Sequence, residues 1–183
     1  PVVLEDATRV ASLLAGDLHI SPRPVMEDFD RIEASGITRV TASGGNRIVF
    51  AGLNYDMEPF GDKRVRQAVN HAVDSALLNE VYLRGTGEGM ASVLPSTVPG
   101  YDPAIDPYPY DPALARELLK EAGFSNGFKT TIEVNPGWLI AGTEVTQAIA
   151  NFLGEVGIEA ELRFTDAGTL ATAITQRKAG PIY

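Results

Sequence analysis

The sequence contains no cysteine and is poor in basic residues. The absence of cysteine excludes disulfide bonds, thiolate nucleophiles and metal sites with cysteine ligands. Lys and Arg together number 15 against 24 Asp and Glu, which gives a formal net charge of −9. Because a surface of this sign repels polyanions on average, the balance argues against a nucleic-acid partner.

Long apolar runs are missing as well. The most apolar stretches, Val10 to Ala15 and Ile149 to Leu153, are short and are bounded by polar residues, whereas spanning a bilayer core of about 30 Å takes roughly 20 apolar residues. The first residues, Pro1-Val2-Val3, contain no Met, no basic region and no apolar signal core. We therefore expect that any export signal has been removed or lies upstream.

What the chain does contain suffices for one hydrophobic core. Its 183 residues are 44% hydrophobic, which lies within the usual range of a single domain. The first part predicts a helix from Asp6 to Ala15 ended by Gly16, a brief strand over Asp17–Ile20, and a second helix from Pro24 that stops at Gly36.

The next segment predicts an antiparallel hairpin. Ile37–Thr41 and Arg47–Asn54 are rich in β-forming residues, and Ser43-Gly44-Gly45-Asn46 between them is typical of a turn. Because alternate residues of a strand share a face, Phe50, Gly52 and Asn54 are expected on one side of the second strand.

The strongest helical pattern runs from Asp62, a candidate N-cap, to about Leu83. Its apolar face comprises Val65, Ala68, Val69, Ala72, Val73, Ala76 and Leu77. No periodicity survives from Gly85 to Tyr110, which predicts a long ordered loop. Asp111-Pro112 then predicts an N-cap and first turn of a helix that Gly123 ends.

The last third has the clearest topology. Lys129–Val134 and Glu159–Phe164 alternate apolar and polar residues, and Thr143–Glu155 between them has helical periodicity. This order predicts a parallel β-α-β crossover. A weaker helix, from Asp166 to about Arg177, would begin another crossover whose returning strand we expect to be missing. The predicted fold class is α/β, with a mixed sheet flanked by helices.

Catalytic chemistry has little support in the pattern. His19 and His71 lie in a short strand and inside a helix, without a serine or cysteine motif and without zinc-ligand spacing. Structural or surface roles explain both better. A hydrolase that uses Ser92 or Ser96 stays as an alternative, although neither serine lies in a G-x-S-x-G elbow.

Two further patterns resemble ligand sites only superficially. Asp102, Asp106 and Asp111 each precede proline, and their loop lacks the glycine and closing glutamate of a calcium loop, so turn and N-cap roles explain them better. Gly85-Thr86-Gly87-Glu88-Gly89 follows a helix and lacks the Lys-Ser/Thr pair of a phosphate loop. We expect neither a metal nor another cofactor.

Two places are better candidates for binding a ligand. Gly52, beside Asn54 on the predicted strand, leaves room for another backbone or a ligand to approach. Asn135-Pro136-Gly137-Trp138 forms the loop at the carboxyl end of a parallel strand, where open α/β sheets usually bind ligands. Trp138, the single tryptophan, could equally cap the core.

Several segments together resemble one family. Residues 54–74 are similar to the pattern N-x-x-x-x-P-F-x-D-x-R-V-R-Q-A-x-x-x-A-x-D of ABC-transporter solute-binding proteins of the oligopeptide, dipeptide and nickel class, known as family 5. Three more segments agree in order with family patterns: Leu14–Ile20, Tyr110–Gly123 and Phe152–Ile158. His19 departs from the family, which often has aspartate there.

The resemblance implies a function that composition alone does not. In this family two α/β lobes close over a peptide or similar solute, which passes to a membrane permease with ATPase subunits. The chain resembles the second lobe, without the N-terminal lobe and without the Trp-x-x-Asp segment that anchors ligands. Gly52, Asn54, Asn135 and Trp138 would then face the cleft of a non-enzymatic binding protein.

The resemblance also implies a location outside the cytoplasm. The parent would be periplasmic or extracellular, either free or lipid-anchored at the cytoplasmic membrane, and the sequence leaves these alternatives open. A sensor or regulatory lobe on the same scaffold is a further alternative, because the same scaffold could present a bound ligand to another protein.

Overall fold

The computed structural model describes residues 3–22, 25–42, 45–46, 48–139 and 141–183. The chain divides into two compact units, Pro1–Gly44 and Gly45–Tyr183. The second unit contains both strands, most of the helices and all four residues predicted to bind a ligand.

The first unit is helical. Helix α1 (Asp6–Leu14) is followed by Gly16 with φ of +82°, and α2 (Phe29–Ala34) is preceded by the 3₁₀ turn η1 (Met26–Asp28). Both predicted helices are therefore confirmed, although Pro24 lies outside the described residues. Val10 of α1 and Ile32 of α2 are almost fully buried.

The predicted strand over Asp17–Ile20 is wrong. The backbone N–H groups of Asp17 and Leu18 both donate to the carbonyl oxygen of Ser12, at 2.9 and 3.2 Å. These amides complete the end of α1, so they cannot form a strand ladder.

The predicted hairpin is also wrong. Residues 37–42 form no strand, and the backbone N–H of Val40 donates instead to Glu33 Oε1. The second predicted strand pairs elsewhere, because Leu53 forms an antiparallel bridge with Ile182. Ser43, Gly44 and Arg47, which belonged to the predicted turn and strand, lie outside the described residues.

The long predicted helix is two helices. Helix α3 (Lys63–Ala72) ends where Val73 adopts an extended conformation, with φ of −103° and ψ of 121°, and α4 (Ser75–Leu83) follows. Asp74 causes the new start, since its side chain accepts a hydrogen bond of 2.9 Å from the backbone N–H of Leu77. The apolar periodicity continues across this break, so the sequence pattern did not indicate that Asp74 caps a second helix.

Helix α5 (Pro112–Glu121) begins and ends as predicted. The Asp111 carboxylate accepts hydrogen bonds from the backbone N–H groups of Ala113 and Leu114, at 3.1 and 2.9 Å. Gly123 follows the helix with φ of +91°, in the left-handed region that favours glycine.

The predicted crossover is present. Strands β1 (Phe128–Val134) and β2 (Ile158–Phe164) pair in parallel in the register Phe128↔Ile158 to Val134↔Phe164, and α6 (Gly142–Glu155) connects them. The 3₁₀ turn η2 (Pro136–Trp138) lies between β1 and α6. Helix α7 (Ala167–Thr175) follows β2, as predicted.

The chain returns to the sheet after α7, which corrects the expectation that this strand would be missing. Ile182 bridges Ile132 of β1 in parallel and Leu53 in antiparallel orientation. Residues 181–183 therefore lie between residues 52–54 and β1, and they give the sheet its mixed character.

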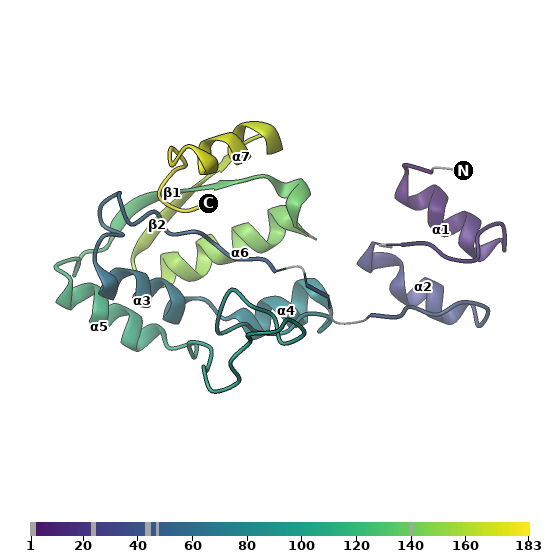
Figure 1. Ribbon diagram of the computed structural model, residues 1–183, viewed down its shortest axis with the longest axis horizontal. Coiled ribbons are helices and arrows are strands. Elements are labelled where there is room, and N and C mark those ends of the chain that lie inside the picture. The colour runs from purple at the N-terminus through teal and green to yellow at the C-terminus, as the bar shows by residue number, and fades with distance from the viewer. Residues whose placement is uncertain (1–2, 23–24, 43–44, 47, 140) are drawn as a thin grey trace. The chain divides into compact units, whose positions relative to one another are not determined.

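One apolar core lies on one face of this sheet. Figure 1 shows α3, α5 and α6 on one side of the strands and α7 on the other. The buried cluster combines side chains of these three helices with Ile132, Ile158 and Ile182. Lys129, Glu159 and Arg163 lie on the opposite, polar face and are exposed. Among the described residues, no helix is long and apolar enough to span a membrane.

This packing makes Ile182 a sensitive position. Its side chain is 1% exposed, and we expect Ile182→Ala to reduce the free energy of unfolding by about 2–5 kcal/mol through lost burial and a cavity. Urea unfolding followed by Trp138 fluorescence measures the change. Val81→Ala, at a side chain 57% exposed in α4, serves as the control, with an expected effect of about 0.5 kcal/mol. Equal effects of the two substitutions would contradict this packing.

Candidate functional site

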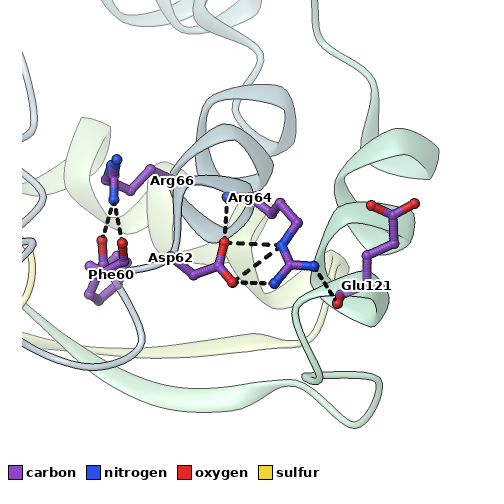
Figure 2. A network of polar contacts seen from close by, with 6 residues as sticks. Phe60, Asp62, Arg64, Arg66 and Glu121 are labelled. Carbon is purple, nitrogen blue, oxygen red and sulfur yellow. Dashed lines mark hydrogen bonds and ion pairs between the residues drawn. The ribbon is translucent and has the colours of Figure 1, made fainter.

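The segment that carries the family resemblance builds the start of α3. Asp62 is its N-cap, and the carboxylate accepts a hydrogen bond of 2.8 Å from the backbone N–H of Arg64. The Arg64 guanidinium lies 2.5 Å from Asp62 Oδ2 and donates to the carbonyl oxygen of Glu121, at 2.7 Å (Figure 2). Because Glu121 ends α5, this arginine also satisfies a carbonyl at that helix's C-terminus.

A second arginine of the same segment holds the preceding loop. Arg66 donates to the carbonyl oxygens of Phe60 and Gly61, at 2.8 and 2.9 Å (Figure 2). The Phe60 ring is fully buried and packs edge-to-face on Phe128 of β1, with 5.9 Å between centroids. The most specific part of the resemblance therefore joins α3, α5 and β1, and these hydrogen bonds and ring contacts are structural.

This network changes the acidity of Asp62. Hydrogen bonds from the Arg64 side chain and backbone lower the pKa of Asp62 from 3.8 to about 2. The charged carboxylate is the form that caps the helix and pairs with the arginine.

The loop after β1 is fixed by backbone and amide contacts. Asn135 donates from Nδ2 to the carbonyl oxygen of Thr165, at 2.9 Å, and so ties this loop to the one after β2. Its own carbonyl accepts from the backbone N–H of Trp138, at 3.1 Å. The Trp138 residue is 37% exposed. Asn135 and Trp138 therefore lie at the carboxyl end of the parallel strands, as predicted.

Gly52 is paired with another backbone segment, which is one of the two alternatives expected for this glycine. Its backbone N–H donates to the carbonyl oxygen of Tyr183 at 2.6 Å, and its carbonyl accepts from the Tyr183 N–H at 3.1 Å. A Cβ at position 52 would lie 2.5 Å from Cε2 of Tyr183. The space that glycine leaves is thus occupied by the ring of Tyr183.

Asn54 bonds within the chain. Its Nδ2 donates to the carbonyl oxygen of Ala179 at 3.1 Å, and its Oδ1 accepts from the backbone N–H of Asp56 at 3.2 Å. The strand register places Asn54 beside Pro181 and Gly52 beside Tyr183. Because residues 181–183 run parallel to β1, Gly52 lies nearer than Asn54 to the end of the sheet that carries Asn135.

Two residues of this region escaped the sequence interpretation. Tyr183 covers Gly52, and Glu133 accepts a hydrogen bond of 2.9 Å from the backbone N–H of Gly180. Both contacts join segments far apart in the chain, so no local pattern reveals them. The alternation of β1 did place Glu133 on the face opposite the core.

The residues weighed for catalysis have other contacts. His71 is buried, lies 2.9 Å through Nδ1 from the carbonyl oxygen of Pro109, and packs edge-to-face on Tyr108. Ser92 exchanges hydrogen bonds with the backbone of Leu94, and Ser96 donates to Glu88 at 2.7 Å. These contacts form no nucleophile–base pair, and His71 has the structural role that we predicted.

The aspartate and glycine patterns are explained by local structure. Asp102 accepts from the backbone N–H of Ala104 at 2.9 Å, which is a turn contact, and Asp111 caps α5. The Asn79 side chain accepts from the N–H of Gly87 and donates to its carbonyl, at 2.9 and 3.0 Å. The backbone N–H of Gly87 is therefore engaged by Asn79 and is not available to a phosphate.

Comparison with known proteins gives one consistent family. Residues 1–182 match the family described as bacterial extracellular solute-binding proteins, family 5 middle. The heme-binding protein A of Haemophilus influenzae is 33% identical over 135 residues, which cover 74% of this chain and 25% of the relative. The glutathione-binding protein GsiB of Escherichia coli is 31% identical over 176 residues, which cover 94% of this chain and 33% of the relative.

A solved structure agrees in fold. The ABC transporter-associated periplasmic binding protein DppA from Helicobacter pylori, in complex with the peptide STSA, superimposes with a TM-score of 0.80 at 28% sequence identity. The match covers 94% of this chain and 33% of that protein. The chain thus spans a quarter to a third of the length of these relatives. Their names describe binding proteins, in agreement with the prediction of a non-enzymatic module.

The network at Asp62 predicts a pH dependence. The pKa of this carboxyl is about 2 in the folded chain against 3.8 for an unperturbed aspartate, so the unfolded chain binds the proton first. The stabilisation of the folded chain by the charged Asp62 carboxylate is therefore complete above about pH 4 and is lost as the pH falls toward 2. Asp62→Asn should remove this part of the pH dependence of the unfolding free energy, measured by urea titrations across that range.

Arg64→Gln provides a matched variant. It removes the first cause of the shift, so the pKa of Asp62 should rise toward 3.8 when the carboxyl carbon is titrated by NMR. An unchanged pKa in this variant would show that Arg64 does not stabilise the carboxylate.

Proposed function

The chain belongs to family 5 of the bacterial extracellular solute-binding proteins, and on this basis we propose that it is the substrate-capture lobe of an ABC importer's binding protein. The observation that carries the proposal is the match of residues 1–182 to the family together with the small part of each relative that the chain covers. One lobe supplies half of the cleft, and the other lobe supplies the rest.

The binding edge in this proposal is the carboxyl end of the parallel strands. Asn135 and Trp138 lie there, and Gly52 lies on the neighbouring segment beside Tyr183. Open α/β sheets bind ligands at this end, and a half-exposed indole offers apolar area to a solute. Asn54 belongs to the same strand, and its amide would reach a solute only by exchanging its bond to Ala179.

The solute in this proposal is a short peptide. Glutathione is a tripeptide, and the DppA structure holds the tetrapeptide STSA. An amide oxygen and N–H at Asn135 suit the backbone of such a solute. Capture involves no broken bond, because binding energy shifts the protein from an open to a closed arrangement of its lobes.

A hollow of about 760 Å³ elsewhere on the unit is a poorer candidate. It lies between α6 and the strands, and its lining includes Lys129, Asn151, Glu155 and Glu159. Lys129 and Glu159 are at the amino ends of β1 and β2, opposite to Asn135. Peptide sites in α/β sheets lie at the other end.

The remaining parts of the proposal concern the whole protein. It would contain an N-terminal lobe that completes the cleft, and it would deliver its solute to a permease with ATPase subunits. Its location would be the periplasm or the outer face of the cytoplasmic membrane, free or held by a lipid anchor.

The proposal predicts weak binding by this chain alone. Calorimetric titration of residues 1–183 with glutathione and with the peptide STSA should give dissociation constants above about 1 mM, equivalent to less than about 4 kcal/mol. A longer protein that includes the other lobe should bind at least one of them in the micromolar range. Micromolar binding by the 183-residue chain itself would overturn the two-lobe proposal.

Trp138→Ala in the longer protein tests the site. Loss of the indole should weaken peptide binding about tenfold or more, since 1.4 kcal/mol corresponds to a factor of ten. The matched control is Tyr55→Ala, which removes another exposed aromatic side chain and should leave the affinity within about twofold. If the two substitutions weaken binding equally, Trp138 is not part of the site.

A further inference from the structure

Glu133 holds a partly buried charge at the centre of the sheet. It belongs to β1, and its side chain is only 13% exposed. Oε2 accepts from the backbone N–H of Gly180 at 2.9 Å, and Oε1 accepts from Arg163 Nη1 at 3.1 Å. Both carboxylate oxygens are therefore paired, as a poorly solvated charge requires.

The contact with Gly180 is unusually close. A Cβ at position 180 would lie 3.0 Å from Cδ and 3.1 Å from Cγ of Glu133, so only glycine lets the backbone approach without displacement. The Asn54 amide donates to the carbonyl oxygen of the preceding residue, Ala179. Two side chains from different segments, Glu133 and Asn54, therefore hold the Ala179-Gly180 segment through hydrogen bonds.

The position of the Ala179-Gly180 segment determines where the next residues lie. Directly after Gly180, residues Pro181–Tyr183 pair with residues 52–54 on one side and with β1 on the other. The backbone bonds of Gly52 and the ring above it both come from Tyr183. A displacement at Gly180 would therefore move Tyr183 relative to Gly52.

We propose that Glu133 is a positioning residue for the binding edge, which acts through Gly180 to hold Tyr183 over Gly52. The inference rests on the proposed function only in naming that edge as the place where a solute binds. The carboxylate is suited to this role because an ionised acceptor forms a stronger hydrogen bond with a backbone N–H than a neutral one does.

The test compares Glu133→Ala and Glu133→Gln in the 183-residue chain by NMR. The Hα of Gly52 that takes the place of a Cβ points toward the Tyr183 ring, since a Cβ there would lie 2.5 Å from Cε2, and this proton should show an upfield ring-current shift. This shift should be lost in Glu133→Ala and kept in Glu133→Gln, which retains an acceptor oxygen for Gly180. A mere loss of global stability would not change this native-state signal.

Amide hydrogen exchange supplies the second measurement. In Glu133→Ala, exchange at Gly180, Gly52 and Tyr183 should accelerate about tenfold or more, while amides in α6 change less than about threefold. Glu161→Ala is the control, because Glu161 lies exposed on the same face of the neighbouring strand. It should alter neither the Gly52 shift nor these exchange rates.

Two results would overturn the inference. One is an unchanged Gly52 shift in Glu133→Ala, and the other is acceleration of exchange spread equally over α6 and residues 180–183. Neither measurement uses a ligand, so failure of peptide binding in the calorimetric test would reject the proposed function and leave the positioning role standing.

Discussion

The structure of the second unit depends on the short segment between Ala179 and Tyr183. Its backbone bonds to β1 on one side, where the N–H of Glu133 donates to the carbonyl of Ile182, and to Gly52 and Asn54 on the other. Ile182 points into the core, and Tyr183 points to the opposite face over Gly52. Without this segment, residues 52–54 would have no ladder partner among the described residues, and β1 would be an open edge.

The residues that resemble the family pattern also have structural contacts. Residues 54–74 connect the strand at Asn54 to α3, and their arginines bond to helix ends and loop carbonyls. A pattern that identifies a family is therefore compatible with purely structural duties. The residues that could meet a solute lie instead at the ends of strands, where packing leaves Trp138 partly exposed.

Local signals in the sequence predicted much of the fold. The caps at Asp62 and Asp111, the glycine after α5 and the alternation of β1 and β2 each depend on neighbouring residues, so their outcome did not require knowledge of the tertiary structure. Two predictions were wrong because competing signals lie in one segment. The apolar stripe continued across the helix cap at Asp74, and in the β-rich run Ile37–Thr41 the backbone N–H of Val40 donates to Glu33 and not to a strand.

Pairing of Leu53 with Ile182 joins residues far apart in sequence, and no periodicity encodes it. The position of Asn135 and Trp138 followed from the crossover alone, whereas the roles of Tyr183 and Glu133 depended on that distant pairing.

In the proposed function, a solute binds at the carboxyl end of this sheet when a second lobe closes over it. The decisive measurement is a crystal structure of a longer protein, with both lobes and a bound peptide. We expect the peptide to contact Trp138 and the loop at Asn135 and to be enclosed by the other lobe. A peptide bound instead in the hollow between α6 and the amino ends of β1 and β2 would contradict it.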